Sequence, residues 1–164
     1  MADSLAGRTA FDTGGAIRAG LLAGLVFVIL EMILVGTVGG GSPWGPPRMM
    51  AAIGMGKEVL PPPPTFDLAI FIVGMIVHFV LSVILALVFC WIATRMHLSR
   101  TMFILAGAVF GLVVYVVNFY GLTAIFPWFA MARNWITIFA HIVFGVVLAW
   151  AYLPKLRGTV RAQA

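Results

Sequence analysis

Four residues that can carry chemistry lie inside apolar stretches of this chain, and they are Glu31, His78, Asn118 and His141. A carboxylate and two imidazoles can take up and release protons. Two histidines with one carboxylate also form a common ligand set for zinc, iron or manganese. An unpaired glutamate in hydrocarbon costs at least a few kcal/mol, so isolated placement of these groups would be unfavourable. We therefore interpret the four residues as one shared intramembrane site.

The composition points to a protein that lies in lipid. The chain has 164 residues, of which 63% are hydrophobic and 9% are charged, and its mean hydropathy is +1.12. A soluble domain carries about 25% charged residues because its surface faces water. The net charge of +5 is scattered between apolar blocks and forms no contiguous basic stretch. This pattern predicts the lipid bilayer as a partner and argues against nucleic acid.

The sequence predicts an all-α, four-helix membrane bundle that forms a single domain over residues 1–164. A bilayer core requires about 20 apolar residues in a helix. The stretches that qualify are residues 17–38, 68–93, 102–126 and 135–153. The connections 94–101 and 127–134 are short, which favours antiparallel neighbours. Residues 1–18 lack the basic start of a cleaved signal peptide, so we expect the first stretch to remain a helix.

The long connection over residues 39–67 is rich in glycine and proline. It opens with three glycines, continues to Pro47, and closes with four prolines at 61–64. Proline fixes φ and lacks an N–H donor, so we expect both flanks to be extended and non-helical. Residues 48–60 between them can form a short helix, apolar through Met49, Ile53 and Val59. This helix would lie on the membrane surface or cap the bundle; the alternative is a disordered linker.

The distribution of basic residues predicts the orientation of the bundle. Cytoplasmic loops of membrane proteins carry an excess of lysine and arginine. Three basic residues lie on the side of the long loop, namely Arg48, Lys57 and Arg133. The side of the termini carries seven, namely Arg8, Arg18, Arg95, Arg100, Lys155, Arg157 and Arg161. We therefore expect cytoplasmic termini in a bacterial inner membrane, with Arg48, Arg133 and Trp128 at the outer surface.

The four polar residues share a depth in the predicted bundle. Each lies about six to ten residues from the outer end of its helix, which corresponds to roughly 10–15 Å at 1.5 Å per residue. Small residues at four-residue spacing share the faces of the polar residues and let helices approach closely. Ser82 and Tyr115 lie on the same faces and are expected to give polar support.

Three functions fit these residues. The first is a proton or divalent metal site made by Glu31, His78 and His141, with Asn118 in support. The second is a b-type haem held by His78 and His141 as axial ligands. In the third, the chain is an accessory or assembly subunit of a larger membrane complex, or a homo-oligomer, and the polar cluster holds the helices together. No phosphate-binding loop or nucleophile elbow is present, so the sequence does not indicate an enzyme acting by itself.

Several motifs resemble a set of small uncharacterised four-helix inner-membrane proteins of bacteria. The resemblance covers roughly residues 20–153 and includes His78 and His141. Its motifs are Ser42-Pro43-Trp44-Gly45-Pro46-Pro47-Arg48, Leu60-Pro61-Pro62-Pro63, and the run from Asn118-Phe119-Tyr120-Gly121 to Phe126-Pro127-Trp128 and on to Trp135. Some of those proteins carry the label "sodium:proline symporter", although symporters of that kind have many more helices. The chain also resembles YagU-type inner-membrane proteins, but Ala140 precedes His141 where those have a glycine. The resemblance implies a bacterial inner membrane location and leaves the function open.

Overall fold

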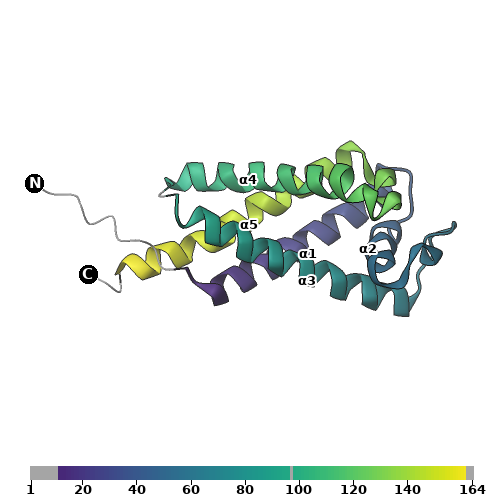
Figure 1. Ribbon diagram of the computed structural model, residues 1–164, viewed down its shortest axis with the longest axis horizontal. Coiled ribbons are helices and arrows are strands. Elements are labelled where there is room, and N and C mark those ends of the chain that lie inside the picture. Colours follow the sequence, from purple (N-terminus) through teal and green to yellow (C-terminus); the bar gives the residue numbers. More distant parts are fainter. Residues whose placement is uncertain (1–10, 97, 162–164) are drawn as a thin grey trace, which may run out of the picture.

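Four long helices run side by side along the molecule (Figure 1). The computed structural model describes residues 11–96 and 98–161, with side chains up to Leu153. The long helices are α1 (Thr13–Thr37), α3 (Leu68–Ala93), α4 (Arg100–Val116) and α5 (Trp135–Arg161). A π-helical turn η2 (Val117–Gly121) and a short helix η3 (Leu122–Ala124) extend α4. Within these residues, four helical segments are long and apolar enough to span a membrane, which supports a multi-pass membrane protein.

Aspartate side chains cap the starts of two helices, α1 and α3. The carboxylate of Asp12 accepts a hydrogen bond of 2.9 Å from the N–H of Gly15, so α1 begins at residue 13 and not at residue 17. Asp67 caps α3 in the same way through the N–H of Ile70, at 3.0 Å. A capping oxygen satisfies an N–H that has no partner inside the helix. The predicted bounds of 68–93 for the second span match α3.

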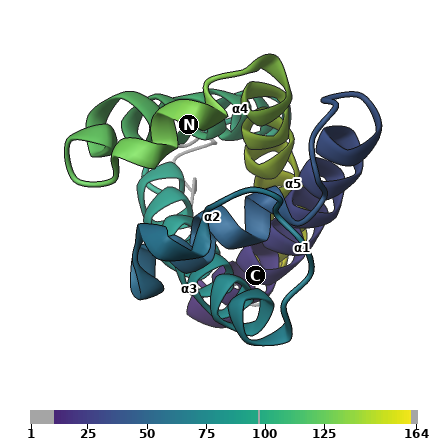
Figure 2. The ribbon, with the colours of Figure 1, turned by 90° about the vertical axis from the view of Figure 1, so that its right-hand side faces the viewer.

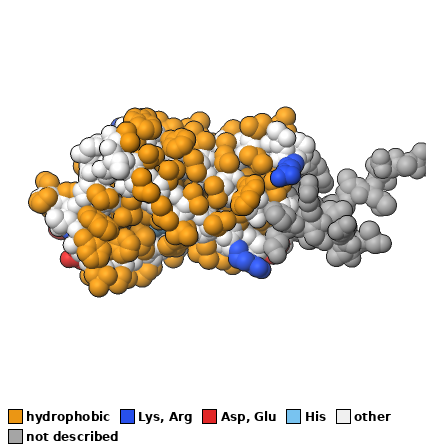
Figure 3. Space-filling model, turned by 180° about the vertical axis from the view of Figure 1, so that it is seen from behind, with side chains coloured by type: hydrophobic (Ala, Val, Ile, Leu, Met, Phe, Trp, Pro, Cys, Tyr) orange, Lys and Arg blue, Asp and Glu red, His pale blue; other side chains and the backbone are white. Residues whose placement is uncertain are grey.

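The bundle carries its large aliphatic side chains outward and its small and polar residues inward. Ile33, Ile76 and Val109 are between 55% and 60% exposed. The buried polar residues are Glu31, His78, Ser82, Thr94, Thr137 and His141. In the view from behind, apolar side chains cover the length of the surface and charged ones lie towards its ends (Figure 3). A surface of this kind is suited to lipid. Large exposed aliphatic side chains are unfavourable in water, whereas lipid tails are as apolar as the side chains.

The helices pack in the order α4, α5, α1, α3 (Figure 2). Gly107 of α4 lies against the backbone of Gly145 of α5, and there is no room for a Cβ atom at either position. Gly24 of α1 similarly lies against Ser82 of α3. By contrast, α3 and α4 share few contacts, although the connection between them is short. The short connection therefore does not make closely packed neighbours of the two helices along their length.

A short helix, α2 (Gly45–Met55), lies across one end of the bundle (Figure 2). The prediction of an extended flank up to Pro47 was wrong, because Pro46 and Pro47 occupy the first turn of α2. Proline suits the first turn, where its missing N–H would have no helical partner. Pro47 and Ala51 are buried against α3, where Gly74 leaves room for them. A short 3-10 helix, η1 (Lys57–Val59), follows, so the segment is an ordered cap and not a disordered linker.

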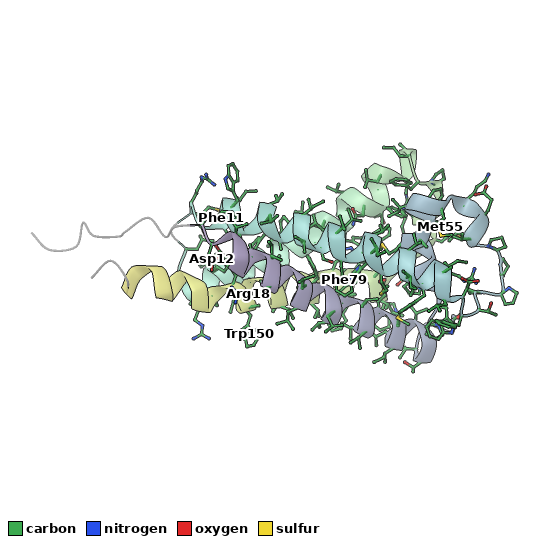
Figure 4. The ribbon with its side chains drawn as sticks, turned by 90° about the horizontal axis from the view of Figure 1, so that it is seen from below. Phe11, Asp12, Arg18, Met55, Phe79 and Trp150 are labelled. Carbon is green, nitrogen blue, oxygen red and sulfur yellow. The ribbon has the colours of Figure 1, made fainter. Side chains whose placement is uncertain are left out.

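The start of α1 and the later part of α5 lie at the opposite end from α2. The N–H of Asp12 donates a 2.9 Å hydrogen bond to the hydroxyl oxygen of Tyr152. Figure 4 places Asp12 and Arg18 at this "Asp12 end" and Met55 at the "α2 end". Arg95 and Arg100 belong to the Asp12 end, because α3 ends there and α4 begins there (Figure 1). Of the other predicted cytoplasmic residues, Arg8 lies outside the described residues, as do the side chains of Lys155, Arg157 and Arg161.

Candidate functional site

Glu31 lies inside the bundle towards the α2 end. Its side chain is 6% exposed, and its Oε1 accepts a 2.9 Å hydrogen bond from the hydroxyl of Thr137 on α5. No lysine, arginine or histidine of the described residues forms an ion pair with it. The carboxyl group also lines a cavity of about 150 Å³, together with Met49, Met131 and Asn134. Glu31 is therefore a buried acid with one hydrogen-bond donor beside a cavity.

Thr137 holds two of the candidate residues in place. Its hydroxyl binds Glu31, and its carbonyl oxygen accepts a 2.8 Å hydrogen bond from Nδ1 of His141 one helical turn later. Asn134 precedes α5 and accepts a 3.1 Å hydrogen bond from the N–H of Thr137. The side chain of Thr137 is 2% exposed. This residue thus fixes the carboxylate of α1 and the imidazole of α5 relative to each other.

His141 presents one free nitrogen. Because Nδ1 donates to a carbonyl oxygen, it carries the proton in a neutral ring and Nε2 carries a lone pair. Nε2 has no hydrogen-bond partner among the described residues. The ring is 4% exposed and lies edge-on to Phe27, Tyr115 and Phe119, at centroid distances of 4.8, 5.7 and 5.4 Å. Aromatic packing holds the ring in position and leaves Nε2 available.

His78 is held in a complementary way. Its Nε2 donates a 2.9 Å hydrogen bond to the carbonyl oxygen of Gly24 on α1, which leaves the lone pair on Nδ1. Within the described part of the chain, Nδ1 has no partner. Gly24 is suited to this contact because a Cβ atom there would overlap Ser82 and approach His78. The ring of Phe27 stacks on His78 at 5.5 Å and also touches His141, so one aromatic side chain contacts both imidazoles.

The two histidines line a second cavity, of about 120 Å³. Ser82 and Asn118 also line it, and Phe27 and Val114 are among its apolar residues. Asn118 belongs to the π-helical turn η2. A π-turn is a local widening of a helix that is frequent at functional sites. This cavity brings together three of the four predicted polar residues and the predicted supporting residue Ser82, while Tyr115 contacts the site through the ring of His141.

The structure does not bring Glu31 into the same cavity as the histidines. Glu31 lines the cavity of about 150 Å³, and Met50 is the residue that lines both cavities. Among the described residues, no group of three or more histidine, cysteine, aspartate or glutamate side chains is arranged to hold a metal ion. The ligand set Glu31, His78 and His141 is therefore not assembled around one point.

The space between the histidines does not fit a haem. The ring of Phe27 lies against both imidazoles, and the adjoining cavity has a volume of about 120 Å³. A cavity of about 150 Å³ accommodates one benzene molecule, and a porphyrin is several times larger. In addition, Nε2 of His78 is already engaged with Gly24. The bis-histidine arrangement predicted as an alternative is consequently not formed by these side chains.

The predicted outer-surface residues lie at the α2 end. Arg48 donates to the carbonyl oxygens of Val59 at 2.7 Å and Thr65 at 2.9 Å, which ties α2 to the segment that follows it. Arg133 donates to the carbonyl oxygen of Phe119 at 2.7 Å. Trp128 lies in the 3-10 helix η4 (Pro127–Ala132), and its buried Nε1 has no hydrogen-bond partner among the described residues. The two arginines act as structural ties at this end.

Sequence reasoning missed three residues that build the site, namely Gly24 as a hydrogen-bond acceptor, Phe27 and Thr137. Thr137 lies three residues after Asn134 and four before His141, the spacing of neighbours on one helix face. That spacing was a usable signal for a polar row on α5. The roles of Gly24 and Phe27 depend on the contact of α1 with α3 and α5, which no local pattern encodes.

Comparisons with protein-family models, with curated proteins and with solved structures find no match to this chain.

Proposed function

We propose that this chain is a small multi-pass protein of the bacterial inner membrane with a proton-exchanging site in the outer half of the bilayer. Both termini would be cytoplasmic, and the α2 end would face outward. The motif resemblance supports the bacterial inner membrane. The basic residues of the sequence support the orientation, because more of them belong to the Asp12 end than to the α2 end. The end of α5 at Arg161 lies at the Asp12 end. The four long apolar helices support the multi-pass arrangement.

The observation that carries the proposal is the unpaired burial of Glu31. The carboxyl group is 6% exposed, receives one hydrogen bond from Thr137, and has no basic partner among the described residues. A buried charge without a counter-ion is strongly destabilising, so a group of this kind binds a proton or a cation. The cavity beside it has room for several water molecules. Water there would carry protons to and from the carboxyl group.

The histidine cavity extends this site. His78 and His141 each have a free ring nitrogen, and each can accept a proton. Met50 lines both this cavity and that of Glu31, so the two cavities adjoin at one side chain. Glu31 would exchange protons with the outer face, and the histidines would form the inner part of the same site. Thr137 would be a positioning residue that keeps Glu31 and His141 in register.

The site would be open to one side of the membrane only. Between the histidines and the Asp12 end, the interior is a packed apolar cluster in which Ala86, Leu148 and Ala149 are fully buried. Tyr152 closes this cluster beside the start of α1. This packed cluster favours reversible proton uptake from the outer face over conduction across the bilayer. This reading is also preferred to the metal site, because Glu31 and the two histidines line different cavities.

Infrared difference spectroscopy tests the proposal. The protein is reconstituted in liposomes with the α2 end outward, and the external pH is changed while the internal pH is held. We expect a carboxylic C=O band that responds to external pH and is lost in Glu31→Gln. The matched control is Glu58→Gln, because Glu58 is an exposed acid at the same end.

Two outcomes would overturn the proposal. In one, the C=O band persists unchanged in Glu31→Gln, so that residue 31 does not titrate. In the other, the band follows internal pH, so that the site opens to the Asp12 end. Orientation is checked on liposomes of the variant Lys57→Cys with a membrane-impermeant thiol reagent, because residue 57 is exposed at the α2 end.

A further inference from the structure

We infer that the histidine cavity binds a neutral, lipid-dissolved molecule whose hydroxyl group enters between α3 and α4 while its apolar tail stays in the bilayer. The inference concerns the same two histidines as the proposed proton site. It rests on the proposed function in one respect, namely that His78 and His141 do more than hold helices together.

Two ring nitrogens of the histidines that line the cavity have lone pairs and no protein donor among the described residues. Nδ1 of His78 and Nε2 of His141 are lone-pair nitrogens on rings that are 5% and 4% exposed, and neither has a partner among the described residues. Both nitrogens remain accessible although their rings are largely buried, so a donor that enters the cavity can bond to them. A ligand hydroxyl has one O–H and supplies a donor to one of these two nitrogens. Asn118 and Ser82 line the same cavity and can bond the hydroxyl oxygen.

The wall of the cavity reaches the surface of the bundle between α3 and α4. Leu81 and Ile84 of α3 line it, yet they are 40% and 50% exposed, so this wall reaches the surface of the helix bundle. Val114 and Asn118 line it from the side of α4 and η2. The helices α3 and α4 share few contacts, so no packed helix interface closes this seam. Both helices are apolar spans, and the opening therefore faces hydrocarbon and not water.

The volume of the cavity limits the size of the group that can enter it. The cavity holds about 120 Å³, slightly less than a 150 Å³ cavity that binds benzene. It is too small to enclose a whole ring, and it accepts a short hydroxyl-bearing head or part of a single ring while the rest of the molecule stays outside the opening. Phe27 and Phe144 among its lining residues provide apolar contact for such a head. A charged head would have to cross hydrocarbon to enter, and the described residues place no lysine, arginine or acid on the cavity wall. The occupant is therefore a neutral alcohol, phenol or quinol with an apolar tail.

The experiment uses 4-pentylphenol as the probe and pentylbenzene as its matched control without the hydroxyl group. The full chain is labelled with ¹⁵N-histidine in nanodiscs at one constant pH, and His97→Asn removes the signals of the third histidine. We expect pentylphenol to shift the unprotonated ring nitrogen of whichever histidine, His78 or His141, accepts its single O–H. Pentylbenzene should bind about tenfold more weakly, as expected for the loss of one hydrogen bond to a buried acceptor.

A second variant pair tests the route of entry. Ile84→Trp places a bulky ring at the opening and should abolish the shifts. Ile76→Trp changes a residue of the same helix that is 59% exposed and does not line the cavity, and it should have no effect. The inference is overturned if both probes shift the nitrogens equally, if pentylphenol shifts neither, or if Ile84→Trp binds like wild type. Failure here leaves the titration of Glu31 untouched, and Glu31→Gln abolishes the infrared band without affecting phenol binding.

Discussion

The hydroxyl of Thr137 donates a 2.9 Å hydrogen bond to Oε1 of Glu31 and so joins α5 to α1 across 106 positions of sequence. Both side chains are buried, and the carbonyl of Thr137 simultaneously accepts from His141. One residue thus sets the positions of two protonatable groups that line different cavities.

Thr137→Val removes the hydroxyl and keeps the shape of the side chain. We expect unfolding in a denaturing detergent to become easier by about 0.6–2 kcal/mol, the range for hydrogen bonds between membrane helices. Thr137→Ser should restore most of the loss. Thr37→Val is the control, because the exposed hydroxyl of Thr37 bonds only within its own helix, to the carbonyl of Ile33. Equal stability of Thr137→Val and wild type would show that the Glu31 contact contributes nothing.

Gly145→Ala should disrupt the crossing of α4 and α5. A Cβ atom at this position meets the backbone of Gly107, which cannot move aside as a flexible side chain would. We expect destabilisation of about 1–3 kcal/mol, as for overpacking of a well-packed core. Gly121→Ala is the matched control, since no atom lies within 4 Å of the added Cβ. Thermal unfolding in mild detergent, followed by circular dichroism, separates the two variants.

Asp12→Ala should weaken the start of α1. The carboxylate of Asp12 caps the N–H of Gly15, and loss of such a cap typically costs about 1 kcal/mol. Asp12→Asn keeps an acceptor oxygen and should remain close to wild type. Hydrogen exchange of the amides of residues 13–16 is the measurement, with faster exchange expected only in the alanine variant. Faster exchange in both variants would instead assign the effect to the charge.

Proteoliposomes containing the wild-type chain should hold a proton gradient as long as empty liposomes do. The reason is the packed apolar cluster around Leu148 and Ala149, which separates the histidine cavity from the Asp12 end. An entrapped pH-sensitive dye measures the decay, and a protonophore provides the positive control. Faster decay with the wild-type protein, reduced again in Glu31→Gln, would contradict a one-sided site.

The sequence predicted the spans well because each is a long apolar run with few alternatives. Residues 68–93 coincide with α3, and the outward Ile and inward small residues follow directly from helical spacing. The early start of α2 was missed because a Gly-Pro-Pro run was interpreted as extended, whereas prolines also suit a first helical turn.

The candidate site was predicted less completely than the spans. A shared depth for Glu31, His78, Asn118 and His141 follows from counting residues along helices. Their division between two cavities does not, because it depends on how far each helix is rotated and on the ring of Phe27. The π-turn at Asn118 is also invisible in the sequence, since the inserted residue has no characteristic type. The packing of the helices therefore determines which of these residues share a cavity, and the residue pattern alone does not.

The extensive contact between the first and last helices has a consequence for biogenesis. Glu31 enters the membrane with α1, but its partner Thr137 is synthesised 106 residues later. At about 5–20 residues per second, this interval lasts roughly 5–20 s. During that time Glu31 of α1 lacks its hydrogen-bond donor, because Thr137 of α5 has not yet been synthesised. The translocation machinery, or water at the outer membrane surface, must shelter α1 until α5 arrives, so the last helix to be inserted completes the bundle.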